Sequence, residues 1–242
     1  LQKFAGRRAE STSEFLELLM LSDGGPDRPA LSVEERLELG VSLLNQQYRD
    51  DPKFIGRMTL GLAMQFSKHD NTRRAIELYE QAYAIGRRTR DTELMVYAQC
   101  YRAYEEAHAD INAGVLERIA EAEQLLSETD DADAILQADC LMAKVRVQQR
   151  HGDTQSAEAL ARQGMKLLEA NGSTHHASYI YLLDELGNIY LTRNQPREVL
   201  KIDRRVGEIL DRSGRGGTAT RLLYRQNEAV SLFALGEISE SL

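Results

Sequence analysis

The sequence Leu186-Gly187-Asn188-Ile189-Tyr190 is followed by the turn-forming pair Asn194-Gln195 and then by Val199. Such an order places a small residue inside a helix, a tight turn after it, and a small apolar residue near the start of a second helix. Asn tolerates the left-handed backbone conformation of a tight turn, and small residues allow two helices to approach closely. This stretch therefore predicts a pair of antiparallel helices.

The same order recurs along the chain. Successive turns are separated by 40, 42, 42 and 42 residues, at Asp70, Asp110, Gly152, Asn194 and Gly236. The small residues that open the second helices are separated by 40, 42 and 42 residues, at Ala75, Val115, Ala157 and Val199. One further step of 42 reaches Ser241, next to the last residue. A fixed period of this size is the signature of a repeat architecture, so we expect an all-α solenoid with four helix pairs and a truncated fifth.

The rest of the sequence also favours helices. Ala, Leu, Glu, Arg and Gln dominate, and these residues favour helices. None of the four prolines interrupts a long periodic stretch, and no strand-like alternation is present. Ser32 and Glu35 have the spacing of a capping box and predict a helix start there. We also expect a helix over residues 14–21, followed by the Gly/Pro-rich loop 22–29.

Charge and hydropathy exclude several classes of protein. The chain has 242 residues with 30 Lys and Arg against 38 Asp and Glu, a net charge of −8. Nucleic-acid binders usually carry a basic patch, so we expect no nucleic-acid partner. No apolar run approaches the roughly 18 residues that span a bilayer, so we expect no membrane contact by this chain.

No motif for catalysis or cofactor binding is present. The chain has no His-Arg-Asp or Asp-Phe-Gly kinase signature and no Gly-x-x-x-x-Gly-Lys phosphate loop. His175 and His176 adjoin each other, but no Cys or carboxylate pair lies at metal-ligand spacing from them. We therefore expect no catalytic residues, no cofactor and no metal in this chain.

The repeated segments resemble the tetratricopeptide repeat (TPR). Leu186-Gly187 and Tyr190 match its first helix, Gly152-Asp153 and Gly236-Glu237 match its turn, and the second helix is matched by Ala75, Tyr79 and Ala82. The resemblance covers about residues 52–242 and implies a right-handed α-α superhelix. Two features depart from the family. The period exceeds the usual 34 residues, and residues 91–110 match poorly, so no helix phase is assigned there.

The first fifty residues suggest a longer protein. The segment 7–16, the Gly/Pro loop and Leu31-Ser32-Val33-Glu34-Glu35 precede repeats that begin at Asp51-Pro52. This order resembles the C-terminal part of bacterial membrane-anchored serine/threonine protein kinases. It implies an N-terminal region 1–50, a TPR-like array 51–242, and a kinase domain and membrane helix before Leu1, in keeping with the absent initiator Met.

Under that resemblance the chain is the non-catalytic regulatory or sensor region of a signalling kinase, on the extracytoplasmic side of the membrane. The alternative is the TPR portion of a cytoplasmic transcriptional or peptide-sensing regulator. In both cases the function is to bind a protein or peptide.

A concave groove lined by first helices is the expected binding site. Six residues are predicted to point away from the packing face, namely Arg57, Met64, Tyr181, Asp184, Asn188 and Gln226. The competing interpretation for each is an ordinary surface residue. We further expect the truncated end to expose an apolar face around Leu232 and Leu235, and therefore to self-associate or to fray after about residue 236.

Overall fold

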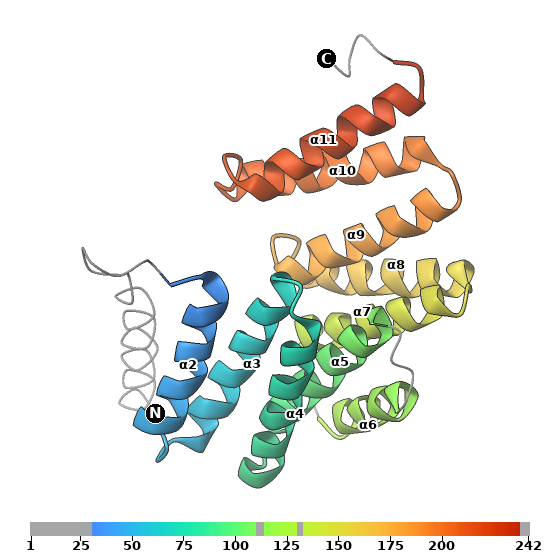
Figure 1. Ribbon diagram of the computed structural model, residues 1–242. Coiled ribbons are helices and arrows are strands. Elements are labelled where there is room, and N and C mark those ends of the chain that lie inside the picture. The colour runs from blue at the N-terminus through green and yellow to red at the C-terminus, as the bar shows by residue number, and fades with distance from the viewer. Residues whose placement is uncertain (1–30, 110–113, 130–132, 238–242) are drawn as a thin grey trace, which may run out of the picture. The chain divides into compact units, whose positions relative to one another are not determined.

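The computed structural model of the chain describes residues 31–109, 114–129 and 133–237 (Figure 1). All regular structure in these ranges is α-helical. The helices are α2 (Val33–Gln47), α3 (Pro52–Lys68), α4 (Thr72–Thr89), α5 (Thr92–His108), α6 (Val115–Ser127), α7 (Ala134–Arg150), α8 (Thr154–Ala170), α9 (Ala177–Thr192), α10 (Pro196–Arg212) and α11 (Ala219–Ala234).

The chain divides into two compact units, Leu1–Leu125 and Leu126–Leu242. In the first unit α2 packs on α3, α3 on α4 and α4 on α5, and α3 also contacts α5. In the second unit each helix from α7 to α11 packs on the next one, and α7 also contacts α9. Each unit thus stacks antiparallel helix pairs on one another, so the predicted all-α, TPR-like solenoid fold is confirmed. The first helices begin at residues 52, 92, 134, 177 and 219, which gives intervals of 40 to 43 residues.

The predicted turns have one shared backbone geometry. Gly152 has a positive φ of 77° and donates its N–H to the carbonyl of Gln149, while the N–H of Asp153 bonds the carbonyl of Gln148. This is the Schellman motif, which satisfies the last carbonyls of a helix. The same two bonds and a positive φ recur at the other described turn positions, Asp70, Asn194 and Gly236. The remaining predicted turn, Asp110, lies outside the described residues.

The small residues predicted to open the second helices are all buried. The list is Ala75, Val115, Ala157 and Val199. Close approach is evident at Gly56 of α3, where an added Cβ would lie 2.5 Å from Cδ2 of Leu94 on α5, and at Gly164 of α8, where it would lie 2.8 Å from Cδ1 of Leu182 on α9. Gly187 is buried and faces α10, but its Cβ would lie 3.6 Å from Cγ2 of Ile202, which is an ordinary van der Waals distance. Small side chains therefore set the separation between neighbouring helices.

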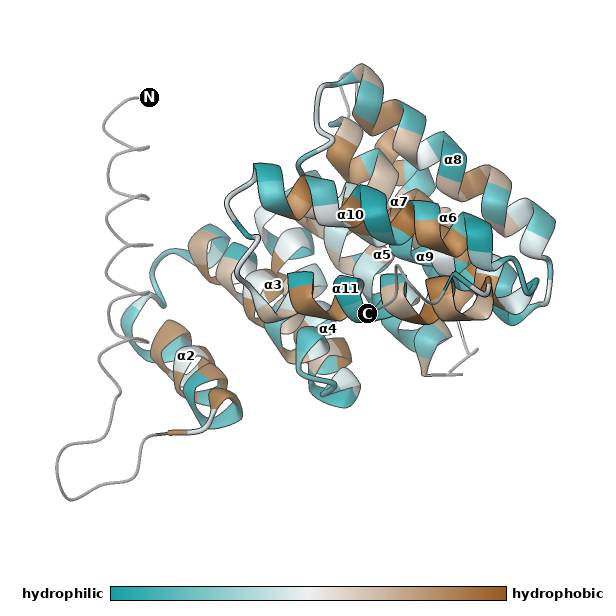
Figure 2. Cartoon of the chain, turned by 90° about the horizontal axis from the view of Figure 1, so that it is seen from above, coloured by the Kyte–Doolittle hydropathy of each residue, from teal (hydrophilic) through white to brown (hydrophobic). Residues whose placement is uncertain are grey.

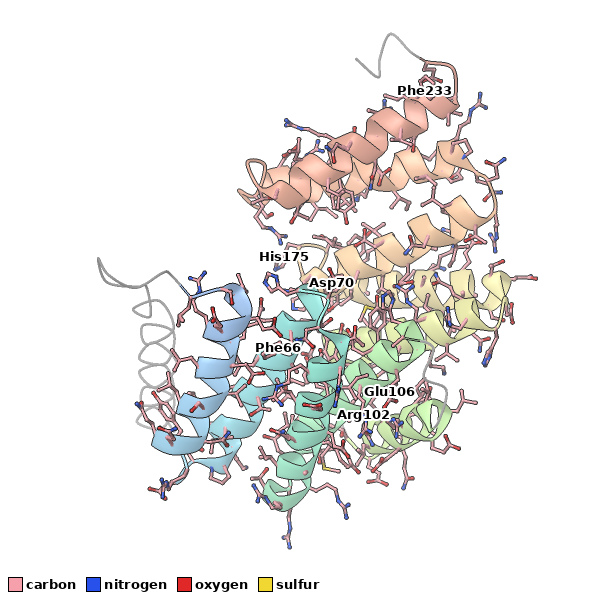
Figure 3. The ribbon with its side chains drawn as sticks, in the orientation of Figure 1. Phe66, Asp70, Arg102, Glu106, His175 and Phe233 are labelled. Carbon is pink, nitrogen blue, oxygen red and sulfur yellow. The ribbon has the colours of Figure 1, made fainter. Side chains whose placement is uncertain are left out.

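Helix α5 explains why residues 91–110 showed no clear helical phase. Hydrophobic and hydrophilic residues recur along each helix (Figure 2), but α5 is buried on most of its circumference, including Glu105 and Glu106. The carboxylate of Glu106 pairs with Arg102 at 2.9 Å and with Arg118 at 2.6 Å, and Arg102 and Glu106 are labelled in Figure 3. A helix that is buried on most sides has no single apolar stripe to detect.

Of the two helices predicted in the first fifty residues, only the second lies among the described residues. Ser32 caps α2 through the predicted capping box, in which the Ser32 N–H donates to Glu35 at 2.7 Å. The predicted helix over residues 14–21 lies outside the described residues, as does the loop that follows it.

The exposed apolar face of α11 differs from the predicted one. Leu232 is only 5% exposed and Leu235 is half-buried. The exposed apolar side chains of α11 are Leu222, Leu223, Val230 and Phe233, and Phe233 is labelled near the end of this helix in Figure 3. The prediction was wrong because Leu232 shares a helical face with Tyr224, which packs inward.

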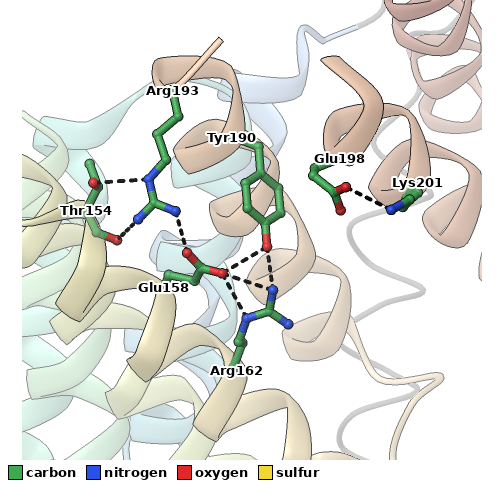
Figure 4. A network of polar contacts seen from close by, with 7 residues as sticks. All are labelled: Thr154, Glu158, Arg162, Tyr190, Arg193, Glu198 and Lys201. Atoms are coloured by element: carbon green, nitrogen blue, oxygen red, sulfur yellow. Dashed lines mark hydrogen bonds and ion pairs between the residues drawn. The ribbon is translucent and has the colours of Figure 1, made fainter. Parts of the chain in front are cut away.

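A polar network joins α8 to α9 (Figure 4). The Tyr190 hydroxyl donates to Oε1 of Glu158 at 3.1 Å and accepts from Nη2 of Arg162 at 2.6 Å. Arg193 pairs with the same Glu158 carboxylate and donates to the Thr154 carbonyl at 2.9 Å. Arg193 is the main cause that lowers the pKa of Glu158. The buried Tyr190 ring and its hydroxyl thus both hold α9 against α8.

The arrangement of α9 predicts a strict order of mutational effects. Tyr190→Ala should cost about 3–5 kcal/mol, because it leaves a cavity and unpaired partners. Gly187→Leu should cost roughly 1–3 kcal/mol by overpacking the contact with α10. The exposed Asn188→Ala should cost less than about 0.5 kcal/mol. Urea melts of the three variants measure this order, and an Asn188→Ala variant as unstable as Tyr190→Ala would mean that α9 presents a different face.

Candidate functional site

The second unit contains a cavity of about 450 Å³ between α9, α10 and α11. We call it the α9–α11 groove. It lies where α9 and α11 approach each other less closely than α7 and α9 do, although the Tyr224 side chain of α11 still reaches Asp184 on α9. Its lining combines apolar and polar side chains from all three helices, namely Asp184, Gly187, Asn188, Leu191, Val199, Ile202, Asp203, Leu223, Tyr224, Asn227 and Val230.

Only part of the predicted site meets at this groove. Asp184 and Asn188 line it, one helical turn apart on α9. Tyr181 and Gln226 lie on the helices that flank the groove but are not among its lining residues.

The two other predicted residues belong to α3 in the first unit. Arg57 pairs there with Glu93 at 3.0 Å and with Asp91 at 3.4 Å, both near the start of α5. Met64 is half-buried on the same helix. The six predicted residues therefore do not form one continuous site in either unit.

Asp203 and Tyr224 line the groove but were not predicted from the sequence. Asp203 is 5% exposed and lies on the buried face of α10, in register with Val199, Val206 and Leu210. A carboxylate at an otherwise apolar position of a helical stripe was the signal that could have found it. Tyr224 sits similarly on the buried side of α11.

The groove contains two acids, the half-buried Asp184 and the buried Asp203. The Tyr224 hydroxyl donates to Oδ1 of Asp184. Burial raises the pKa of Asp184 to about 6, and the neighbouring charge of Glu185 adds to the rise. Burial and then the charge of Glu228 raise the pKa of Asp203 to about 7, although a hydrogen bond from Asn227 opposes the rise. Burial also raises the pKa of Tyr224. Both carboxyls are therefore costly to ionise in the isolated chain.

One oxygen of Asp203 has no partner. Its Oδ2 is buried and makes no hydrogen bond. Neither Asp203 nor Asp184 forms an ion pair with a Lys or Arg of the described residues. Groups whose pKa values are strongly raised inside a cavity are candidates for a functional site. Chemically, this groove offers acceptors to a ligand that carries hydrogen-bond donors.

Metal sites and membrane-spanning helices are absent from the described residues. No group of three or more His, Cys, Asp or Glu side chains is arranged to hold a metal ion. Within the same ranges, no helix has the length and hydrophobicity needed to cross a membrane.

Solved structures support the fold. The chain is similar to a variant form of the nearly identical TPR-like repeats of a Podosopora anserina kinesin light chain, with 20% identity over 76% of this chain and 88% of that one and a TM-score of 0.52. A second crystal structure of such repeats from the same source gives a TM-score of 0.51 at 21% identity, over 76% of this chain and 89% of that one. BtubC (BKLC) from P. vanneervenii gives a TM-score of 0.60 at 16% identity over 87% of both chains.

At this level of identity, the likenesses show a shared TPR-like fold. No protein-family model matches the chain, and no curated protein matches it.

The raised pKa of Asp203 predicts a pH-dependent stability. The native chain keeps this proton up to about pH 7, whereas an unfolded Asp releases it near pH 4, so the contribution of Asp203 to stability falls as pH rises between these values. Asp203→Asn should therefore unfold at higher urea than the unmodified chain at pH 8, with a gain of about 1–3 kcal/mol.

The gain should shrink towards pH 5, where Asp203 is protonated. Glu208→Gln removes an exposed carboxylate of the same helix and serves as the control. A gain of equal size at pH 5 and pH 8, or no gain at either, would contradict the assignment of a costly buried carboxyl.

Proposed function

We propose that this chain is a non-catalytic protein-interaction module that binds an extended segment of a partner protein. The α9–α11 groove carries this proposal, because three helices contribute to a cavity with apolar walls and a few polar groups. Ligand sites generally have this composition. The TPR-like fold of the structural neighbours supports an interaction role.

The proposed contact surface begins with Asp184 and Asn188 and continues along the exposed residues of α9 and α11. Leu191, Leu223 and Val230 are exposed apolar side chains at its rim. Tyr181 and Gln226 flank it and belong to the proposal as peripheral contacts. Arg57 and Met64 stay predicted contacts of a separate surface on the first unit.

A matched pair of substitutions tests the groove. Peptides are selected from a display library with the purified chain and their affinities are measured by fluorescence anisotropy. Leu223→Gln removes an apolar side chain at the rim and should weaken the selected peptides at least about tenfold, a change worth about 1.4 kcal/mol. Leu116→Gln makes the same change at a similarly exposed position on α6 and should leave affinity unchanged. Equal effects of both variants would place the binding surface elsewhere.

Self-association is a second proposed property. The exposed apolar side chains of α11 include Phe233 and Val230, which are 68% and 67% exposed. Contiguous apolar surface of this kind commonly marks an interaction site. We therefore expect sedimentation velocity to show a concentration-dependent dimer that Phe233→Gln weakens and Leu116→Gln does not. A monomer at every concentration would contradict the proposal.

The kinase-linked role stays a prediction. The resemblance of the first fifty residues to bacterial serine/threonine kinases, and the alternative of a cytoplasmic regulator, concern the protein to which this chain belongs. The coding sequence upstream of Leu1 tests both. A kinase domain followed by an apolar segment supports the first, and a DNA-binding or nucleotide-binding domain supports the second.

A further inference from the structure

Several buried acids elsewhere in the described residues have donors for their carboxylate oxygens. Glu105 of α5 accepts from the hydroxyls of Ser67 and Thr72. Glu106 of α5 is paired with two arginines. Glu185 of α9 is 1% exposed and pairs with Arg146 at 2.5 Å. Such pairing is expected, because breaking a buried pair leaves a charge at a cost of several kcal/mol. A buried carboxyl that has no base and also leaves one oxygen without a hydrogen-bond donor therefore needs an explanation.

The α9–α11 groove holds one such acid, Asp203, and beside it the half-buried Asp184. Asp203 is buried as deeply as the paired glutamates, yet its Oδ2 is without a partner. Asp184 receives only the neutral Tyr224 hydroxyl. A third acid, Glu228 of α11, also acts on Asp203. The nearby base Arg221 pairs with Glu228 at 3.1 Å and with Asp211 at 3.3 Å. The local base is therefore occupied, and the groove keeps an excess of acidic groups.

The surroundings of these acids are apolar. Val199 and Ile202 of α10 lie in the groove lining, and the exposed Leu191, Leu223 and Val230 form its rim. A long aliphatic stem with a charged head fits this order, since Lys and Arg side chains bury their methylene groups while the head reaches a polar partner. The exposed rim extends the apolar surface beyond the cavity. Apolar residues of the ligand on either side of its Lys or Arg could pack against this rim.

We propose that the α9–α11 groove binds a lysine or arginine side chain of a partner protein segment, with its charged head at Asp203 and Asp184 and apolar neighbours against the rim. This inference rests on the proposed function and specifies the chemistry of the partner. Charge complementarity supports this choice of ligand. Asp203 has no basic partner within the described residues, and a Lys or Arg of the ligand would provide one. A buried ion pair formed in this way fixes the register of the bound segment.

The proposed binding is linked to protons. The cationic head binds the ionised carboxylates, so the ligand must displace any proton that Asp203 holds. The groups that face this carboxyl are Asp184 on α9 and Tyr224, Asn227 and Glu228 on α11. Because Asp203 has a pKa of about 7, affinity should fall as pH is lowered from 8 to 5.5, by roughly tenfold or more from this one group.

The test uses unbiased peptides. Random dodecapeptides displayed on phage are selected with the whole chain at pH 8, and the enriched peptides are synthesised with a fluorescent label. We expect a Lys or Arg flanked by apolar residues in the enriched set. Asp203→Asn should weaken these peptides at least about tenfold. Glu208→Gln, which removes one exposed carboxylate from the same helix, should change affinity less than about twofold.

A change in the peptide isolates the proposed pair. Replacing the enriched Lys by norleucine keeps the stem and removes the charge. This peptide should bind the unmodified chain more weakly and should no longer distinguish it from Asp203→Asn. The fall in affinity at pH 5.5 should also disappear with norleucine. Both measurements use the unmodified chain as well, so they stand even if Asp203→Asn fails to fold.

The outcomes separate this inference from the proposed function. Peptides that depend on Leu223 but lack a basic residue, or that bind Asp203→Asn as tightly as the unmodified chain, would overturn the inference alone. Enrichment of acidic peptides would do the same. A library that yields no groove-dependent peptide would contradict the proposed function and, with it, the inference.

Discussion

The fold depends on a single left-handed residue at each described turn that joins a first helix to its second helix. At Gly152 and its equivalents, a positive φ lets two successive N–H groups reach back to the last turn of the helix, so the chain reverses within a few residues. Gly adopts this conformation without a steric penalty, and Asn and Asp tolerate it. Two amphipathic helices held antiparallel in this way cannot cover all their apolar surface alone, so neighbouring pairs must stack.

Stacking also requires small residues at fixed positions. Ala75 and Ala157 are fully buried, and Gly164 leaves no room for even a Cβ beside Leu182. With a left-handed turn residue and small contact residues in place, neighbouring first helices pack directly, as α7 does on α9. The α9–α11 groove is the place in the second unit where two first helices lie further apart and meet mainly through the Tyr224 side chain. A cavity in a solenoid therefore follows from an interruption of the packing rule rather than from an added element.

The buried acids of the chain differ in whether an arginine neutralises them. Glu106 and Glu185 are buried against arginines and act as internal ties. Asp203 is equally buried without such a base, which makes the isolated chain less stable than it could be at neutral pH. Proteins retain a destabilising group of this kind where it serves a function, because stability above a threshold is not itself selected. The groove thus differs from the remaining core in chemistry as well as in shape.

The sequence by itself determined the repeat, the turns, the small contact residues and the exposed and buried faces of α9, because a helix period, a left-handed turn residue and a side-chain size are local properties. The buried face of α11 was harder, since apolar residues on two faces do not reveal which one packs. Only the tertiary structure decided that Asp184, Asp203 and Tyr224 share one cavity and that Asp203 has no base. Both facts depend on which side chains of neighbouring helices converge, and helix packing rather than spacing within one helix sets that convergence.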